Sequence, residues 1–292
     1  MATSRRRARS VLATLGAAAV LVGGAAAPAG ATPAERYVSL GDSYTSAPGV
    51  PVQIDANCGR SNSNYPSLTA RELDIASFRD VSCGGATTAE MWRAQGTNPP
   101  QLDALNKRTT LVSLQIGGND IGFGEIIATC ARLGATDPTG APCTAHYTKG
   151  GTDVLARRIA AAAPRVHKVI RAIHQRAPRA KVYVLGYPAI TPETGPGCWP
   201  SVPTAAGDVA YNRATAKRLN AMLRIVATLS RATYVDTYKP SIGHDACRPP
   251  ATRWVEPLVP ASPAAPFHPN AKGEKAMADA LLKHLTRPGR DH

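Results

Sequence analysis

Two segments far apart in the sequence contain the residue types needed for nucleophilic catalysis. The segment Gly41-Asp42-Ser43 places a serine directly after an apolar run, and Phe267-His268-Pro269 places an imidazole near the C-terminus. A serine hydroxyl becomes a nucleophile when a neighbouring histidine accepts its proton. The local pattern also fits a turn or helix-cap serine, because Thr45 replaces the second glycine of the G-x-S-x-G nucleophile elbow. A lone histidine is likewise common as a surface or capping residue.

Two glycine-rich segments between them can supply hydrogen-bond donors. Cys83-Gly84-Gly85 can present a bare backbone N–H, and Gly117-Gly118-Asn119 adds a side-chain amide after a flexible turn. Backbone N–H groups and Asn amides are donors that stabilise an oxyanion during acyl transfer. Either segment alone is a common turn sequence. Their occurrence with Ser43 and His268 in one chain favours acyl-transfer chemistry.

Alternating strands and helices are predicted to position these segments. Short apolar runs indicate strands, and the amphipathic stretches between them indicate helices. Strands are expected at 36–41, 77–82, 110–117, 181–187 and 232–236. Helices are expected at 65–74, 100–105, 151–163, 164–175, 209–230 and 271–285. The third helical region is divided at Pro164, because proline disrupts a helix interior.

This order of elements predicts an α/β fold, a three-layer αβα sandwich formed by a single domain. Strands regularly separated by helices build βαβ units, whose parallel sheet is covered on both faces. Open sheets of this kind bind ligands at the carboxyl ends of their strands. Ser43, Gly85 and Asn119 each follow a predicted strand, so we expect them at one edge of the sheet. The Pro-rich stretches are typical of surface loops, and the sequence contains no internal repeat.

The four segments resemble, in their order and spacing, the four sequence blocks of the SGNH (GDSL) hydrolase family, particularly its secreted bacterial lipases and esterases. The resemblance covers residues 36–285 and includes the six cysteines. It implies a flavodoxin-like parallel sheet and hydrolysis of carboxylic esters without a metal or organic cofactor. It assigns Ser43 as nucleophile and His268 as base. It also assigns the Ser43 N–H, the Gly85 N–H and the Asn119 amide as oxyanion donors, with Gly84 as the alternative because the doubled glycine leaves the register open.

The sequence departs from the family pattern at one position. Many members carry an aspartate three residues before the histidine, and here that residue is Ala265. The resemblance then implies a Ser–His dyad, in which the main-chain carbonyl of Ala265 or Pro266 holds the imidazole in the required tautomer. Asp245 is the alternative third member, although its place beside Cys247 also fits a loop role.

The first 31 residues predict export. Four arginines within residues 5–9 precede an apolar run over residues 11–27 and a small-residue triplet at 29–31, which is the layout of a secretory signal peptide. We therefore expect a signal peptide at 1–31, a hydrolase domain at 32–292 and a secreted, extracellular protein. A retained membrane anchor is the alternative, but the run is shorter than the roughly 20 residues that span a bilayer.

Export makes disulfide bonds the expected state of the cysteines, because secreted proteins fold in oxidising surroundings. No Cys or His spacing typical of zinc occurs. Six cysteines allow fifteen pairings in principle. Pairing between neighbours in the sequence is predicted, which gives Cys58–Cys83, Cys130–Cys143 and Cys198–Cys247.

The formal net charge of +14 first suggests a nucleic-acid partner. Without the four arginines of the predicted signal peptide, 30 basic residues face 20 acidic ones, and the charge falls to +10. No basic cluster with interleaved aromatic residues accompanies this charge, so no nucleic acid is expected as a partner. Transient contact with anionic lipid interfaces is expected instead. We expect a monomer.

The expected activity is that of a secreted esterase or lipase acting on esters of the acylglycerol type. Phospholipase and carbohydrate O-acetyl esterase activities are the enzymatic alternatives, and a non-catalytic secreted binding protein is the alternative from another class. Four apolar residues that precede His268 are expected either to line an acyl pocket or to be ordinary core, namely Trp254, Val255, Leu258 and Val259.

Overall fold

A five-stranded parallel sheet forms the centre of the protein. The computed structural model describes residues 1–2 and 35–286, so the predicted signal peptide lies outside the described residues apart from its first two. The strands are β1 (Arg36–Gly41), β4 (Ser77–Asp80), β5 (Leu111–Gln115), β6 (Lys181–Leu185) and β7 (Thr233–Val235). Their spatial order is β4-β1-β5-β6-β7, which is the flavodoxin-like order of doubly wound folds. The predicted α/β fold class is confirmed.

Side chains alternate between the two faces of this sheet, and both faces are buried. Val38 and Leu40 of β1 pack with Val112 of β5 toward one face, while Tyr37 and Leu111 pack toward the other. Both sets are apolar because helices cover both faces, as expected for a parallel sheet.

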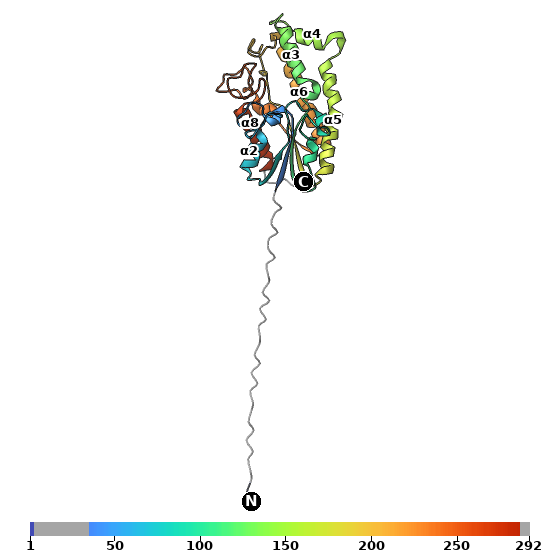
Figure 1. Cartoon of the computed structure of the whole chain (residues 1–292), viewed down its shortest axis with the longest axis vertical. Helices are drawn as coiled ribbons and strands as arrows, with labels where there is room; N and C mark the ends of the chain where they lie inside the picture. The colour runs from blue at the N-terminus through green and yellow to red at the C-terminus, as the bar shows by residue number, and fades with distance from the viewer. Residues whose placement is uncertain (3–34, 287–292) are drawn as a thin grey trace. The chain divides into compact units, whose positions relative to one another are not determined.

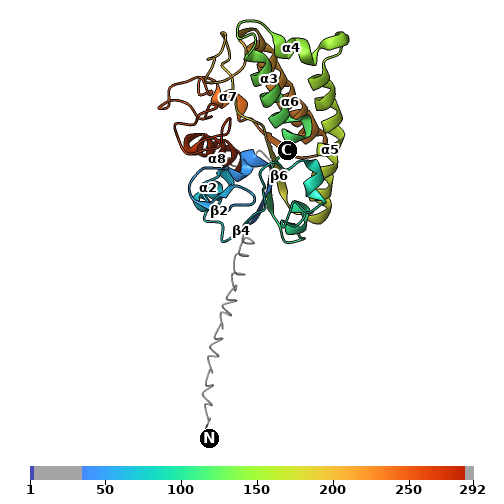
Figure 2. The same ribbon diagram turned by 45° about the horizontal axis from the view of Figure 1, so that its top comes forward.

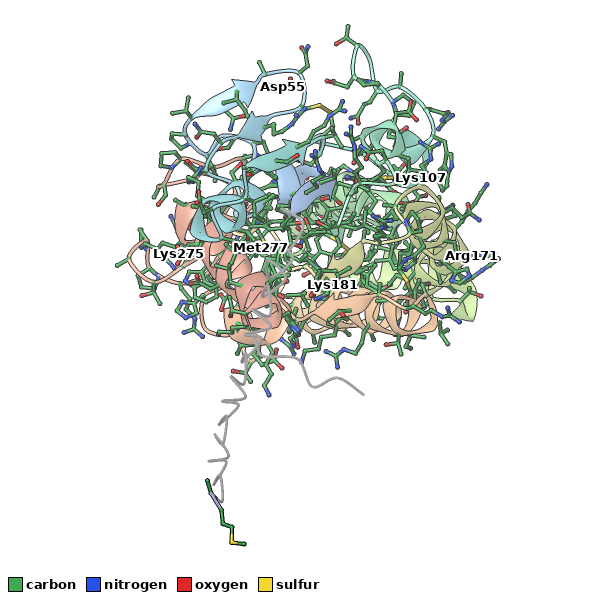
Figure 3. The ribbon with its side chains drawn as sticks, turned by 90° about the horizontal axis from the view of Figure 1, so that it is seen from below. Asp55, Lys107, Arg171, Lys181, Lys275 and Met277 are labelled. Atoms are coloured by element: carbon green, nitrogen blue, oxygen red, sulfur yellow. A yellow bond between two sulfur atoms is a disulfide. The ribbon has the colours of Figure 1, made fainter. Side chains whose placement is uncertain are left out.

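The helices form the outer two layers. Helices α2 (Tyr65–Glu72) and α8 (Ala271–Leu285) lie on one side of the sheet, and α5 (Val154–Arg176) and α6 (Val209–Leu229) cover the other, as Figure 1 shows. In the turned view, α2 and α8 again lie next to each other and opposite α5 (Figure 2). Seen from below, Lys275 of α8 and Arg171 of α5 lie on opposite flanks of the molecule (Figure 3).

In the described part of the chain, shorter elements connect the strands and the long helices. These are α1 (Ser43–Ser46), α3 (Phe123–Gly134), α4 (Pro142–Tyr147) and α7 (Tyr238–Ser241), a two-stranded antiparallel hairpin of β2 (Gln53–Asp55) and β3 (Arg60–Ser61), and five 3₁₀ helices, η1 (Thr88–Met91), η2 (Gln101–Ala104), η3 (Asn119–Ile121), η4 (Lys149–Gly151) and η5 (Ala206–Asp208). The helix expected at 100–105 is therefore the 3₁₀ helix η2.

The predicted break at Pro164 is wrong, because α5 continues through it to Arg176. A proline inside a helix leaves the carbonyl four residues earlier without its hydrogen bond. That carbonyl belongs to Ala160, and both Ala160 and Pro164 are exposed. Water can therefore satisfy the orphaned carbonyl, and the buried stripe of α5 keeps the helix continuous.

Three disulfide bonds tie loops to one another: Cys58–Cys83, Cys130–Cys143 and Cys198–Cys247. The structure thus joins neighbours in the sequence, as predicted. Cys58–Cys83 connects the β2–β3 hairpin to the segment after β4, beside the doubled glycine. Over the described part of the chain, no helix is both long and apolar enough to cross a membrane.

Candidate active site

Ser43 is the first residue of α1, directly after β1. The Asp42 carboxylate caps this helix by accepting a hydrogen bond from the Tyr44 N–H at 3.0 Å. The turn is too tight for a side chain at Gly41, where a Cβ atom would lie 2.2 Å from Thr45 Oγ1. The sequence Gly-Asp-Ser therefore fits this turn for steric and hydrogen-bonding reasons, and it places the serine at the carboxyl edge of the sheet.

The Ser43 hydroxyl contacts the imidazole of His268. Ser43 Oγ lies 2.8 Å from His268 Nε2, although the two residues are 225 positions apart. His268 Nδ1 lies 2.8 Å from the main-chain carbonyl oxygen of Pro266. A carbonyl oxygen accepts and cannot donate, so Nδ1 carries the hydrogen and Nε2 offers its lone pair to the Ser43 O–H. This is the protonation state in which a histidine can act as a base toward a serine.

Asp245 does not take part in this pair. Its carboxylate is buried in its own turn, where it accepts the Cys247 N–H at 3.1 Å and contacts Arg248 Nε at 3.2 Å. The carbonyl of Ala265 accepts the main-chain N–H of His268 at 3.2 Å. Of the acceptors considered from the sequence, Pro266 is the one bonded to the imidazole.

The segment before His268 is fixed by main-chain pairing with the loop that contains Glu256. The Glu256 N–H donates to the His268 carbonyl at 3.0 Å, and the Phe267 N–H donates to the Glu256 carbonyl at 2.9 Å. The Glu256 carboxylate is itself buried, where it pairs with the Arg253 guanidinium at 3.0 Å and accepts the Asn270 amide at 2.7 Å. A paired and hydrogen-bonded buried carboxylate holds this loop in one arrangement.

Phe267 turns the chain sharply so that the His268 side chain reaches Ser43. Its φ angle of 62° is left-handed, which is uncommon for a bulky residue and costs on the order of 1–3 kcal/mol. The ring packs in a core cluster with Val202 and Val255, and the carbonyl accepts the Tyr44 O–H at 2.6 Å. These contacts offset the strain and connect the histidine loop to the serine helix.

Burial lowers the pKa of His268 below its ordinary value near 6.5, because the apolar surroundings disfavour the imidazolium. The hydrogen bond to the Pro266 carbonyl acts in the opposite direction and is the smaller effect. The neutral base therefore persists to more acidic pH than it does for an ordinary histidine.

The three residues expected to donate to an oxyanion, Ser43, Gly85 and Asn119, line one groove. The Gly84 N–H is already bonded to the Cys58 carbonyl at 2.8 Å. By contrast, the N–H groups of Gly85 and Ser43 have no hydrogen-bond partner among the described residues. Gly85 has a left-handed φ of 78°, a conformation that favours glycine. One N–H of the Asn119 amide donates to the Ala86 carbonyl at 2.9 Å, and this bond orients the amide. The second N–H of the amide remains available to a ligand.

A buried hydrogen-bond chain that the sequence did not reveal connects two of these segments. The Tyr187 hydroxyl accepts the Gly118 N–H at 2.9 Å and donates to the Asp42 carboxylate. Burial raises the pKa of Asp42 to about 7, although the bonds from Tyr187 and from the Tyr44 N–H favour its ionised form. Tyr187 lies at the end of an apolar strand, where it resembles any core tyrosine, so the sequence carried no signal for this role.

Two apolar compartments share Ser43 and Asn119 among their lining residues. One, the more enclosed of the two and called the enclosed pocket below, has a volume of about 100 Å³ and lies between α3, α6 and the segment after β6. The other is an open groove of about 560 Å³ between α3 and the loop that precedes His268. Ser43, Asn119, Phe123 and Ile127 line both.

Of the four apolar residues before His268 expected to line an acyl pocket or to be ordinary core, one lines a compartment beside Ser43. Leu258 lines the open groove. Val255 is fully buried core, Trp254 stacks on His244 with ring centroids 4.0 Å apart, and Val259 is 79% exposed. The enclosed pocket is instead lined by apolar side chains that the sequence analysis did not single out, namely Ile121, Ile126, Ile127, Ile190, Val202 and Leu219.

A serine hydrolase is the class of enzyme that this edge of the sheet defines, since it pairs a hydroxyl with an oriented base beside unpaired N–H donors. Sequence comparison is more specific: the chain belongs to the GDSL-like lipase/acylhydrolase family, whose model matches residues 39–276. The resemblance drawn from the four sequence blocks is confirmed, and so is the expected enzyme class, a hydrolase of the GDSL lipase and esterase type.

Similar proteins come from Streptomyces. Lipase 2 of Streptomyces coelicolor is 44% identical over 267 residues, which cover 89% of each chain. Among solved structures, phospholipase A1 of Streptomyces albidoflavus NA297 is similar with a TM-score of 0.72 and 29% identity, over 86% of this chain and 99% of that one. The extracellular lipase of Streptomyces rimosus matches with a TM-score of 0.67, the same identity and the same coverage.

Proposed function

We propose that this protein is a secreted lipase or esterase that hydrolyses carboxylic esters of the acylglycerol type through an acyl-enzyme on Ser43. The observation that carries this proposal is the 2.8 Å contact between Ser43 Oγ and His268 Nε2 at the junction of two apolar compartments. The contact supports nucleophilic catalysis, and the apolar compartments support a substrate with hydrocarbon chains.

Acylation begins when Ser43 Oγ attacks the ester carbonyl carbon and its proton moves to His268 Nε2. The carbonyl oxygen becomes an oxyanion, which accepts hydrogen bonds from the Ser43 N–H, the Gly85 N–H and the Asn119 amide. A donor of this kind lowers a barrier by about 2.7–4 kcal/mol in a comparable oxyanion hole. The bond between the carbonyl carbon and the alcohol oxygen then breaks, and the proton on His268 passes to the departing oxygen.

Deacylation repeats these steps with water. His268 Nε2 accepts a proton from a water molecule as the water oxygen attacks the acyl-enzyme carbonyl. The same three donors hold the second oxyanion. The Ser43 Oγ–carbon bond breaks, His268 returns the proton to Ser43, and the carboxylic acid departs. The Pro266 carbonyl stays bonded to Nδ1 throughout and stabilises the imidazolium formed in each half of the cycle.

Secretion is supported by three independent features. The N-terminal 31 residues have the layout of an export signal. The six cysteines form three disulfide bonds, which persist in oxidising compartments. The similar Streptomyces rimosus protein is an extracellular lipase. Secretion is tested by expressing the full chain in a bacterial host and sequencing the N-terminus of the exported protein, which we expect to begin at Thr32.

The catalytic assignment is tested with Ser43→Ala and His268→Ala, using p-nitrophenyl octanoate and trioctanoylglycerol as substrates. Each variant is expected to lose at least about a thousandfold in kcat, because the nucleophile and its base act as a unit. Ser63→Ala, at a half-buried serine of a loop, is the matched control and is expected to retain full activity. Undiminished hydrolysis by Ser43→Ala would show that the nucleophile assignment is wrong.

Phospholipid hydrolysis is the second candidate activity, because the similar Streptomyces albidoflavus enzyme is a phospholipase A1. The charge of +10 expected after signal removal also favours contact with anionic interfaces. The two activities are separated by comparing trioctanoylglycerol, dioctanoylphosphatidylcholine and an acetylated sugar as substrates. Activity confined to the acetylated sugar would refute both lipid assignments.

A further inference from the structure

The two compartments beside Ser43 differ in whether the catalytic base, His268, belongs to their lining. His268 lines the open groove and not the enclosed pocket, whereas Ser43 and Asn119 line both. In the proposed reaction, His268 Nε2 must deliver a proton to the oxygen of the departing alcohol, which requires hydrogen-bond contact with it. The departing alcohol therefore belongs in the open groove, and the acyl chain that becomes attached to Ser43 belongs in the enclosed pocket.

The open groove is larger and more apolar than a small alcohol needs. Its volume is about 560 Å³, against about 100 Å³ for the enclosed pocket. Beyond the reacting groups, it is lined by small and apolar residues, among them Pro48, Ala128, Ala131, Pro203 and Leu258. No lysine, arginine or carboxylate lies among the residues that line it.

We propose that this groove binds a second acyl chain, carried by the departing alcohol, so that the preferred substrate is a neutral glyceride with at least two acyl chains. This inference rests on the function proposed above. A hydrocarbon chain loses water on entering the groove and is stabilised by about 0.8 kcal/mol per buried methylene. A phosphate would find no lysine or arginine among the described residues that line the groove, so this lining favours a neutral hydrocarbon chain.

The groove ends at the same reacting groups as the enclosed pocket, so one molecule can occupy both. A diglyceride esterified at adjacent carbons places its two ester groups a few bonds apart. The scissile ester lies at Ser43, its acyl chain extends toward Ile126 and Leu219, and the second chain extends along Ala128 toward Leu258. A single-chain ester would leave the groove filled with water.

The test compares 1,2-dioctanoylglycerol with ethyl octanoate, which share the acyl group but differ in the second chain. The wild-type enzyme is expected to favour the diglyceride at least about tenfold in kcat/KM, since two buried methylenes suffice for that ratio. Ala128→Trp fills the groove from the exposed face of α3 and is expected to lower this ratio at least about fivefold. Leu258→Ser, which makes the opposite wall of the groove polar, is also expected to lower this ratio.

Ala160→Trp is the matched control, because Ala160 is exposed on α5 and lines neither compartment. In this variant the ratio of kcat/KM for the diglyceride to kcat/KM for ethyl octanoate should equal that of the wild type. A wild-type ratio near one, or a ratio that Ala128→Trp and Leu258→Ser both leave unchanged, would overturn the proposal. Faster turnover of dioctanoylphosphatidylcholine than of dioctanoylglycerol would overturn the assignment to neutral lipids. Failure of the proposed function is a separate result, since it appears as retained activity in Ser43→Ala.

Discussion

His268 Nδ1 donates its hydrogen to the main-chain carbonyl oxygen of Pro266 at 2.8 Å, in the place where a Ser-His-Asp triad has a carboxylate. Among the described residues no carboxylate is bonded to this imidazole. The orientation of the base thus depends on backbone geometry, which is fixed by the left-handed Phe267 and by the pairing of Glu256 with His268. A neutral acceptor also avoids adding a further buried carboxylate to the site, where that of Asp42 is already buried next to Ser43.

The first prediction concerns Asp245. We expect Asp245→Asn to keep kcat/KM within about twofold of the wild type, because the carboxylate contacts Cys247 and Arg248 and not His268. The same variant should lose about 1–3 kcal/mol of unfolding free energy, since a buried charged hydrogen bond is weakened. Ester hydrolysis and urea unfolding measure the two effects. A loss of activity of a hundredfold or more in the folded variant would establish Asp245 as a third catalytic member.

The second prediction concerns pH. The pKa of His268 is lowered by burial, and the reactive form is the neutral imidazole. As pH rises through this pKa the proton leaves His268, so kcat/KM for a neutral ester should increase and then reach a plateau. The half-maximum should lie below pH 6.5, the ordinary value for histidine. A half-maximum near pH 7 would instead match Asp42, whose pKa is raised to about 7, and would contradict the assignment of the acid limb to His268.

The third prediction tests Tyr187 as a positioning residue. Tyr187→Phe removes the hydroxyl that joins the Gly118 N–H to the Asp42 carboxylate but keeps the ring that lines the enclosed pocket. We expect kcat to fall about tenfold with KM within about twofold, because a small displacement of reacting groups costs rate more than binding. Steady-state kinetics on p-nitrophenyl octanoate separates the two constants.

Tyr37→Phe is the matched control for this experiment. Tyr37 is also a buried tyrosine, and its hydroxyl is bonded to Ser113 at 2.7 Å on the opposite face of the sheet. Tyr187→Phe leaves the buried Gly118 N–H without its acceptor and should lose about 1–3 kcal/mol of unfolding free energy. Tyr37→Phe should lose about 0.5–1.5 kcal/mol, because Ser113 remains bonded to Ser39. A kcat loss of similar size in Tyr37→Phe would mean that general destabilisation, and not positioning by Tyr187, lowers the rate.

The fold could be predicted from the sequence because short apolar runs, most clearly the one at 182–185, alternate with long amphipathic helices. The motif residues could be located for a related reason: Ser43, Gly85 and Asn119 each follow a strand, and the carboxyl ends of parallel strands meet at one edge. His268 was found through the motif around it. Gly85 was already preferred to Gly84 on the family resemblance, and the structure adds a physical reason for that preference, since the Cys58 carbonyl accepts the Gly84 N–H.

The walls of the compartments could not be predicted, because nothing local distinguishes a pocket residue from a core residue. Leu219 and Leu223, one turn apart on the same face of α6, both belong to the buried core cluster, but only Leu219 also lines the enclosed pocket. Val255 and Leu258 differ in a similar way, although both precede His268 by a few residues. Val255 is buried in the core, whereas Leu258 lines the groove. Packing between distant segments decides the difference. The continuity of α5 through Pro164 likewise depends on which face of the helix meets water.

The last prediction concerns the disulfide between Cys198 and Cys247. It closes a segment with a sequence separation of 49, whereas the separation between Cys130 and Cys143 is 13. By loop-closure entropy alone, replacing both cysteines with alanine should cost about 4 kcal/mol for the longer loop and about 3 kcal/mol for the shorter one. Urea unfolding of the two double variants measures this difference.

The longer disulfide should also affect activity before the protein unfolds. Cys198 and Cys247 pack against the cluster that contains Val202 and Phe267, and Phe267 sets the turn that brings His268 to Ser43. Without the crosslink this cluster is held by packing alone, and the left-handed Phe267 is free to relax. We therefore expect the Cys198→Ala, Cys247→Ala variant to lose activity at urea concentrations at which its far-UV circular dichroism is still native. Coincident loss of activity and secondary structure would show that the disulfide stabilises the fold as a whole and does not specifically hold the histidine loop.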